Sequence, residues 1–113
     1  MNLVQFYLLK IAEEAGEVAH IALKAAQFGL SETEPGRLES NAQRLHGELT
    51  DLSAMVHRLG SIQSEFFFDI GSPDHMAIVN KLNKVEKYLS YSVELGMVND
   101  PDEDWDGREK NEN

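Results

Sequence analysis

Long series of apolar residues at helical spacing constrain this chain more than any other feature of its sequence. Over residues 3–28, 37–59 and 72–96, apolar side chains recur every three or four positions, which would gather them on one face of a helix. The stripes consist of Leu3, Tyr7, Ile11, Ala15, Val18, Ala22 and Ala25, then of Leu38, Ala42, Leu45, Leu49, Leu52 and Val56, and finally of Ile78, Leu82, Val85 and Leu89. This pattern predicts an all-α fold, an antiparallel helical bundle of three to four helices per chain.

Glycine, serine and proline mark the expected ends of these helices. Gly29, Gly60 and Gly96 follow the three stripes and are expected to end them, because glycine readily leaves the helical conformation. Ser72 is expected to cap the third helix, with Pro73 as its first residue.

The two segments that connect the predicted helices are expected to have different local structures. Residues 31–36 contain Pro35 and a candidate capping box of Ser31 with Glu34, which suggests a loop before the second helix. Residues 62–70 include three consecutive phenylalanines and fit either a short helix or a packed loop.

Composition excludes several classes of protein. The 113 residues contain no cysteine, which excludes a disulfide framework and a thiolate metal site and favours a reducing, cytoplasmic setting. No apolar run approaches the roughly 18 residues needed to cross a membrane. The formal net charge of −10 argues against a nucleic-acid polymer as the partner. A small phosphorylated ligand is compatible with this charge, because a divalent cation can lie between carboxylates and phosphates.

Negative charge is concentrated at the C-terminal end. Residues 99–113 hold seven acids and two bases, a composition typical of a disordered, solvated tail in which Trp105 could still serve as an anchor. We therefore expect one helical domain over residues 1–97 and an acidic tail over residues 98–113. One thin chain can bury only part of its wide apolar arcs, so we also expect a homodimer or homotetramer.

Two pairs of acids fall inside or beside the apolar arcs. Glu14 and Glu17 lie on the first predicted helix, and Glu48 and Asp51 on the second. With about 100° of turn per residue, Glu14 and Glu48 fall inside the arcs, whereas Glu17 and Asp51 fall at their margins. Carboxylates in a core-facing stripe repel one another and are costly without compensation. A hard divalent cation with oxygen ligands would compensate them.

The same acids admit a simpler interpretation as surface residues. Lys10, Lys24 or Arg58 could pair with them, and Lys10 stands four residues before Glu14. Such exposed ion pairs are common and contribute little to stability. The spacing alone does not separate the two interpretations.

The order of the acids resembles the signature of a known enzyme family. The pattern Glu-Glu-x-x-Glu at residues 13–17, followed by Glu-x-x-Asp at residues 48–51, resembles the MazG-like, all-α nucleoside triphosphate pyrophosphohydrolases, over residues 3–95. The resemblance implies hydrolysis of a nucleoside triphosphate to the monophosphate and pyrophosphate, in a helical dimer or tetramer. One departure is the segment between the two halves, residues 18–47, which is somewhat long for the family.

The resemblance also implies roles for individual acids. It implies that Glu14, Glu17, Glu48 and Asp51 bind Mg²⁺, or Mn²⁺ in its place, with Glu13 as an auxiliary group. Glu14 or Glu13 would be the general base, and Glu14 is favoured because a drier site makes its pKa more tunable.

Candidate ligands for the triphosphate are basic residues on the first and third predicted helices. The family's basic cluster is matched only loosely, by Lys81, Lys84 and Lys87, for which a solvated helical face is an equal alternative. Lys24 lies on the same face as Glu17 and could reach a triphosphate or form an ordinary ion pair. Tyr88 could stack on a base or pack in the core.

Two other classes of protein fit the same sequence. One is a non-catalytic helical dimer whose acidic tail engages a partner. The other is a carboxylate di-metal bundle, suggested by Glu17-x-x-His20, although such sites need two of these motifs. His20 is also compatible with an ordinary surface histidine. The sequence contains no phosphate-binding glycine loop and no zinc-ligand spacing.

Overall fold

The computed structural model describes residues 1–100 and divides the chain into two units, Met1–Pro73 and Asp74–Asn113. Its described part contains helices joined by loops and no strand, which confirms the expected all-α class. The domain expected over residues 1–97 spans both units. Residues 101–113 of the expected acidic tail lie outside the described part. Within residues 1–100, no helix is both long and apolar enough to span a membrane.

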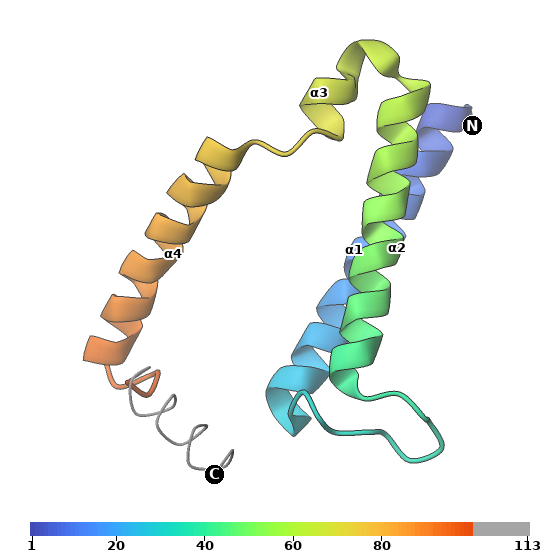
Figure 1. Ribbon diagram of the computed structural model, residues 1–113. Helices are drawn as coiled ribbons and strands as arrows, with labels where there is room; N and C mark the ends of the chain where they lie inside the picture. Colours follow the sequence, from blue (N-terminus) through green and yellow to red (C-terminus); the bar gives the residue numbers. More distant parts are fainter. Residues whose placement is uncertain (101–113) are drawn as a thin grey trace. The chain divides into compact units, whose positions relative to one another are not determined.

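The first unit is built on two antiparallel helices, α1 (Leu3–Phe28) and α2 (Asn41–Ile62), which pack side by side along their length (Figure 1). The bounds of α1 are those expected from its apolar stripe. Asn2 and Gln5 form a capping box at its start, in which each side chain accepts from the other residue's backbone N–H, at 2.8 and 2.9 Å.

The start of α2 differs from the expectation of a helix from Arg37. The helix begins at Asn41, because Ser40 and Gln43 form a capping box there. The box expected between Ser31 and Glu34 does not form, since the Glu34 carboxylate binds basic side chains instead. Leu38, expected on the apolar face of this helix, lies in the loop and is 100% exposed.

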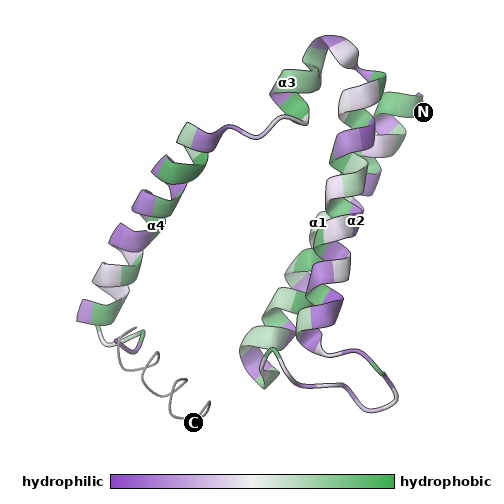
Figure 2. Ribbon diagram, in the orientation of Figure 1, coloured by the Kyte–Doolittle hydropathy of each residue, from purple (hydrophilic) through white to green (hydrophobic). Residues whose placement is uncertain are grey.

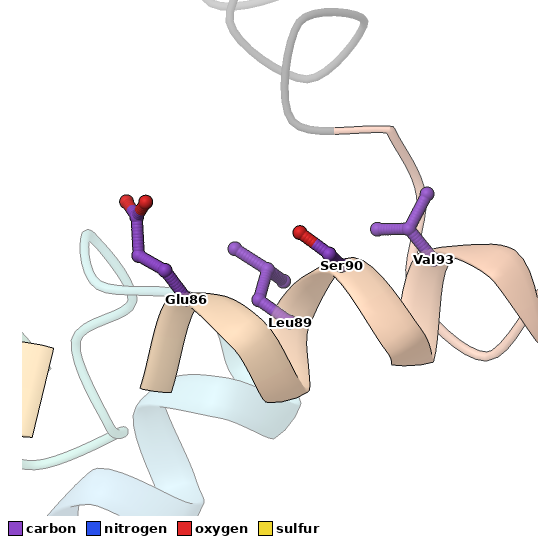
Figure 3. Close-up of a pocket in the computed structure, with 4 residues that line it drawn as sticks. All are labelled: Glu86, Leu89, Ser90 and Val93. Carbon is purple, nitrogen blue, oxygen red and sulfur yellow. The ribbon is translucent and has the colours of Figure 1, made fainter. Parts of the chain in front are cut away.

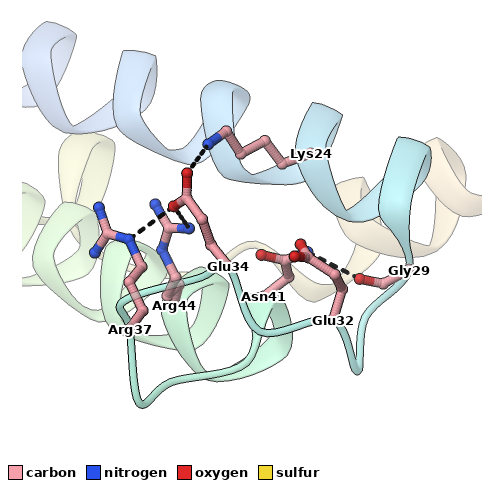
Figure 4. A network of polar contacts seen from close by, with 7 residues as sticks. All are labelled: Lys24, Gly29, Glu32, Glu34, Arg37, Asn41 and Arg44. Carbon is pink, nitrogen blue, oxygen red and sulfur yellow. Dashed lines mark hydrogen bonds and ion pairs between the residues drawn. The ribbon is translucent and has the colours of Figure 1, made fainter.

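Asn41 fixes the loop between α1 and α2 (Figure 4). Its side chain is 0% exposed, and its Nδ2 donates to the Gly29 carbonyl at 3.0 Å and to Glu32 Oε1 at 2.9 Å. Its backbone N–H donates to the Glu32 carbonyl at 2.9 Å. The loop is therefore fastened both to the end of α1 and to the start of α2.

The C-terminal end of α2 continues past Gly60, where we expected it to stop, and is followed by a turn of helix η1 (Ser64–Phe66) and by α3 (Phe67–Ile70). A Cβ atom at Gly60 would lie 3.3 Å from Phe67 Cδ2. Gly60 is therefore a packing position for the Phe67 ring, and not a helix stop. The short-helix alternative for residues 62–70 is confirmed.

The apolar core of the first unit is small. Ile21 of α1 and Leu59 of α2 are 2% and 3% exposed. Many other large apolar side chains stay exposed in this chain, including Leu8, Leu9 and Leu23 of α1. The packing of α1 against α2 thus leaves much of the apolar surface of these two helices uncovered.

The second unit contains α4 (His75–Glu94), whose start corrects our expectation of Ser72 and Pro73. Asp74 caps the helix, its carboxylate accepting from the Ala77 N–H at 3.0 Å. Green apolar and purple polar residues recur along α4 in Figure 2. Gly96 follows the helix with φ +76°, as expected for the glycine that ends it.

Candidate functional site

Three of the four predicted metal ligands meet on the packed faces of α1 and α2. One carboxylate oxygen from each of Glu14, Glu48 and Asp51 lies within 4.8 Å of the others. Glu14 and Glu48 are half-buried and Asp51 is exposed, so the cluster begins in the helix interface and opens to solvent. We call these three residues the acidic triad.

Glu14 occupies the least favourable position of the triad for a negative charge. Partial burial raises the pKa of its carboxyl group, and the negative charges of Asp51 and Glu48, followed by those of Glu13 and Glu17, raise it further. Both causes disfavour the ionised form, because burial removes water and like charges repel. Glu14 is therefore a carboxyl group whose ionisation calls for a positive partner.

Among the described residues, no lysine or arginine forms an ion pair with a member of the acidic triad. Lys10, the nearest candidate in sequence, bonds Glu13 at 3.4 Å, and Lys24 bonds Glu34. The interpretation as surface ion pairs thus holds for Glu13. It does not hold for Glu14, Glu48 or Asp51.

Glu17 and Glu13 stand outside the triad. Both are exposed, and neither contributes an oxygen to the 4.8 Å cluster. Glu17 still acts on Glu14 through its charge. Its position one turn further along α1 leaves it at the edge of the site.

The donor set of the triad fits a hard divalent cation. Mg²⁺ takes oxygen ligands and usually keeps several waters. Two oxygens on one Mg²⁺ lie at most about 4.2 Å apart, since each is about 2.1 Å from the ion. Carboxylates spread over as much as 4.8 Å would need only a small side-chain rotation, or a bridging water, to share one ion. The cluster contains no histidine.

Lys24 forms an ion pair with Glu34, which is the ordinary ion-pair alternative expected for this residue. Its Nζ lies 3.2 Å from Glu34 Oε1, and the other oxygen of Glu34 accepts from Arg37 at 2.8 Å and from Arg44 at 3.2 Å (Figure 4). The two hydrogen bonds from Arg37 and Lys24 lower the pKa of Glu34. Sequence reasoning missed Arg37 and Arg44, although three basic residues near one loop acid signal such a network.

Two of the three predicted basic residues of α4 line a shared groove. Lys84, Lys87, Tyr88 and Tyr91 surround a hollow of about 330 Å³, and Lys81 is not among its lining residues. Positions three, four and seven apart lie on one side of a helix. We call these four residues the Lys/Tyr groove. It belongs to the second unit, whereas the acidic triad belongs to the first.

A second hollow of about 350 Å³ lies on another side of α4. Glu86, Leu89, Ser90 and Val93 line it, and in Figure 3 their side chains follow one another along a single helix. Its lining mixes one carboxylate, one hydroxyl and two apolar side chains and contains no basic group, so it offers no positive charge to a phosphate.

Comparisons with protein-family models, curated proteins and solved structures found no match to this chain.

Proposed function

We propose that this protein is a Mg²⁺-dependent nucleoside triphosphate pyrophosphohydrolase, with Mn²⁺ as an alternative ion, acting in the cytoplasm as a homodimer or homotetramer. The observation that carries the proposal is the acidic triad, in which two helices bring Glu14, Glu48 and Asp51 together without a basic partner among the described residues. The sequence pattern that resembles the MazG-like family supplies the reaction.

The acids have distinct roles in the proposed site. Glu14, Glu48 and Asp51 would hold the cation, and Glu17 would approach it from the margin of the site. When bound, the cation neutralises the triphosphate and polarises its α-phosphate. Glu14 is the preferred general base because its half-buried position gives it a drier site than an exposed carboxylate has. Glu13 is the second candidate, although its carboxylate already pairs with Lys10 at 3.4 Å.

The leaving pyrophosphate needs positive charge to stabilise it. Lys84, Lys87 and Tyr88 share a groove that could bind phosphates and a base, while Lys81 and Lys24 are further candidates. Lys24 would first have to release Glu34. The opposing charge of the carboxylate makes Lys24 the least favourable of these candidates.

Two alternative functions explain fewer of these observations. A non-catalytic helical dimer would explain the exposed apolar surface but not the grouping of three carboxylates. A carboxylate di-metal protein would need histidine ligands, and the acidic triad contains none.

The test is release of pyrophosphate from a panel of nucleoside triphosphates with Mg²⁺, by wild type, Glu14→Gln, Glu48→Gln and Asp51→Asn. Each substitution keeps the shape of the side chain and removes its charge. We expect turnover to fall at least about 100-fold, because even the loss of an outer-shell partner of a metal ligand costs about 10–100-fold. Glu65→Gln, an exposed acid outside the triad, is the matched control. If two triad variants keep near wild-type turnover at saturating Mg²⁺, the proposed site is wrong. Iron that co-purifies with the protein would favour the di-metal alternative.

A further inference from the structure

The Lys/Tyr groove faces away from the apolar stripe of α4. With about 100° of turn per residue, Lys84, Lys87, Tyr88 and Tyr91 centre on one side of the helix, and Ile78, Leu82, Val85 and Leu89 centre nearly opposite. A partner that packs on the apolar stripe alone therefore leaves the groove accessible. The groove combines two ammonium groups with two aromatic rings, a surface suited to an acidic ligand that also carries a ring.

The chain reverses its direction as it leaves α4. The N–H of Gly96 donates to the Val93 carbonyl at 3.0 Å, and the N–H of Met97 donates to the Ser92 carbonyl at 2.9 Å. This pair of hydrogen bonds, with Gly96 at φ +76°, is a Schellman motif. Val98 also donates to Ser92, at 3.3 Å, so the backbone at Val98 lies beside the last turn of the helix.

The sequence that follows this reversal complements the groove. Residues 100–106 read Asp-Pro-Asp-Glu-Asp-Trp-Asp, with five carboxylates and the only tryptophan of the chain. Negative charges complement Lys84 and Lys87, and an indole ring complements tyrosine rings and ammonium groups. Pro101, at the start of this segment, lacks the backbone N–H that a helix interior needs.

We propose that the Lys/Tyr groove binds the chain's own acidic segment, residues 102–106. The carboxylates of this segment pair with Lys84 and Lys87, and the Trp105 ring packs against Tyr88 and Tyr91. The groove is thus an interaction surface for an acidic peptide with an aromatic residue, and this peptide is part of the same molecule.

The length of the segment is sufficient for this contact. Lys84 and Tyr91 are separated by about 10 Å along the axis of α4, at about 1.5 Å per residue. Seven extended residues reach about 23 Å, at roughly 3.3 Å each. A segment that starts beside Ser92 and runs back along the helix can therefore bring its first carboxylates to Lys84 and Lys87, and the remaining length lets Trp105 turn back onto Tyr88 and Tyr91.

Tethering favours this occupant over a free anion. A ligand joined by a short flexible linker has an effective concentration in the millimolar range, which offsets weak individual contacts. Docking does not depend on the proposed hydrolase activity. If Lys84 and Lys87 also bind the substrate, as proposed above, the acidic segment and the triphosphate compete for the same groove.

Trp105 reports on the contact directly, because it is the only tryptophan. We expect its fluorescence in the full chain to resist quenching by acrylamide. In Lys84→Gln/Lys87→Gln the quenching constant should rise at least twofold, with a red-shifted emission. Lys81→Gln, the same charge change on the same helix but outside the groove lining, should raise it much less. Equal quenching in the double variant and wild type would overturn the proposal, as would equal effects of the double variant and Lys81→Gln.

Three further arms separate the contact from other causes. Circular dichroism should show unchanged helix content in the lysine variants, since these positions are exposed. Lys84→Glu/Lys87→Glu should expose Trp105, and adding Glu103→Lys/Asp104→Lys should restore its protection; no restoration would contradict pairing in the groove. Protection should be unchanged on 100-fold dilution, whereas its loss would assign the contact to another copy. These arms do not involve the nucleotide, so they are independent of the pyrophosphate assay.

Discussion

Lys24 Nζ on α1 lies 3.2 Å from Oε1 of Glu34 in the loop that follows. This ion pair joins α1 to the loop that connects it with α2. The second oxygen of Glu34 accepts from Arg37 and from the largely buried Arg44 of α2. One carboxylate therefore connects α1, the loop and α2. This connection holds the two helices in the register that brings Glu14 opposite Glu48 and Asp51.

Replacing Glu34 with Gln should destabilise the protein at neutral pH. The hydrogen bonds from Arg37 and Lys24 lower the Glu34 pKa below its ordinary value of 4.5, so the folded state favours the ionised form. The stability that this pairing contributes is present above pH 4.5 and is lost as the pH falls through the lowered pKa. Thermal melts should show a lower melting temperature for Glu34→Gln at pH 7 and a shrinking difference from wild type in acid.

The control for this prediction is Glu39→Gln in the same loop. Glu39 is exposed and forms no ion pair among residues 1–100, so its loss should change the melting temperature little at any pH. Equal shifts in the two variants would mean that the Glu34 network contributes nothing specific.

Replacing Glu14 with Gln should have the opposite effect on the metal-free protein. Partial burial and the neighbouring acids raise the Glu14 pKa above 4.5. The folded state therefore favours the protonated form, and the stability linked to it is present below pH 4.5 and lost as the pH rises through the raised pKa. In EDTA at pH 7–8, Glu14→Gln should melt at a higher temperature than wild type, and this gain should fade below pH 4.5.

The comparison variant is Glu65→Gln, which removes one charge at an exposed position of η1. The melting temperature of Glu65→Gln should differ little from that of wild type at any pH between 4 and 8. A Glu14→Gln protein that is less stable than wild type at pH 8 without metal would show that the Glu14 carboxylate has a stabilising partner.

Local sequence signals predicted most of the helices. The apolar stripe and Gly29 predicted the bounds of α1, whereas the predicted starts of α2 and α4 were wrong because a stronger cap stood nearby. Ser40 with Gln43 outweighed the apolar spacing that began at Leu38, and Asp74 outweighed Ser72. Both caps follow ordinary rules, so sequence reasoning could have found them.

The acidic triad was predicted in part, because a helical projection finds which side chains share a face but not how two helices are aligned. Glu14, Glu48 and Asp51 meet because the loop sets the register of α2 against α1. Asn41, like Glu34, fastens this loop, through its contacts with Gly29 and Glu32. No local pattern around Asn41 indicates those partners, and for the same reason Glu17 could not be separated from the triad.

The close approach of Gly60 to the Phe67 ring predicts that a larger side chain destabilises the protein more at Gly60 than at Gly47. In Gly60→Val, the new side chain would begin 3.3 Å from Phe67 Cδ2, so the ring must move, and overpacking of this kind costs about 1–3 kcal/mol. Gly47→Val is the matched control, since no atom lies within 4 Å of a Cβ at Gly47. Its effect should stay within roughly 0.5 kcal/mol. Urea unfolding would measure both, and an equal loss in the two variants would contradict the packing of α3 on α2.

Mg²⁺ should stabilise the folded protein far more than a monovalent salt does. An ion that binds the folded state alone stabilises it by about 2.7 kcal/mol at a concentration 100 times its dissociation constant. For a chain of this size, each kcal/mol raises the melting temperature by roughly 4–8 °C. A non-hydrolysable triphosphate should add to the shift, because phosphate oxygens complete the shell of the ion.

Na⁺ at matched ionic strength screens the acidic triad without bridging its carboxylates, so its effect should be small. The Mg²⁺ shift should disappear in Glu48→Gln and persist in Glu65→Gln. Thermal melts in EDTA, Mg²⁺ and matched NaCl decide the matter, and equal shifts from the two salts would mean that the triad is an ordinary solvated cluster.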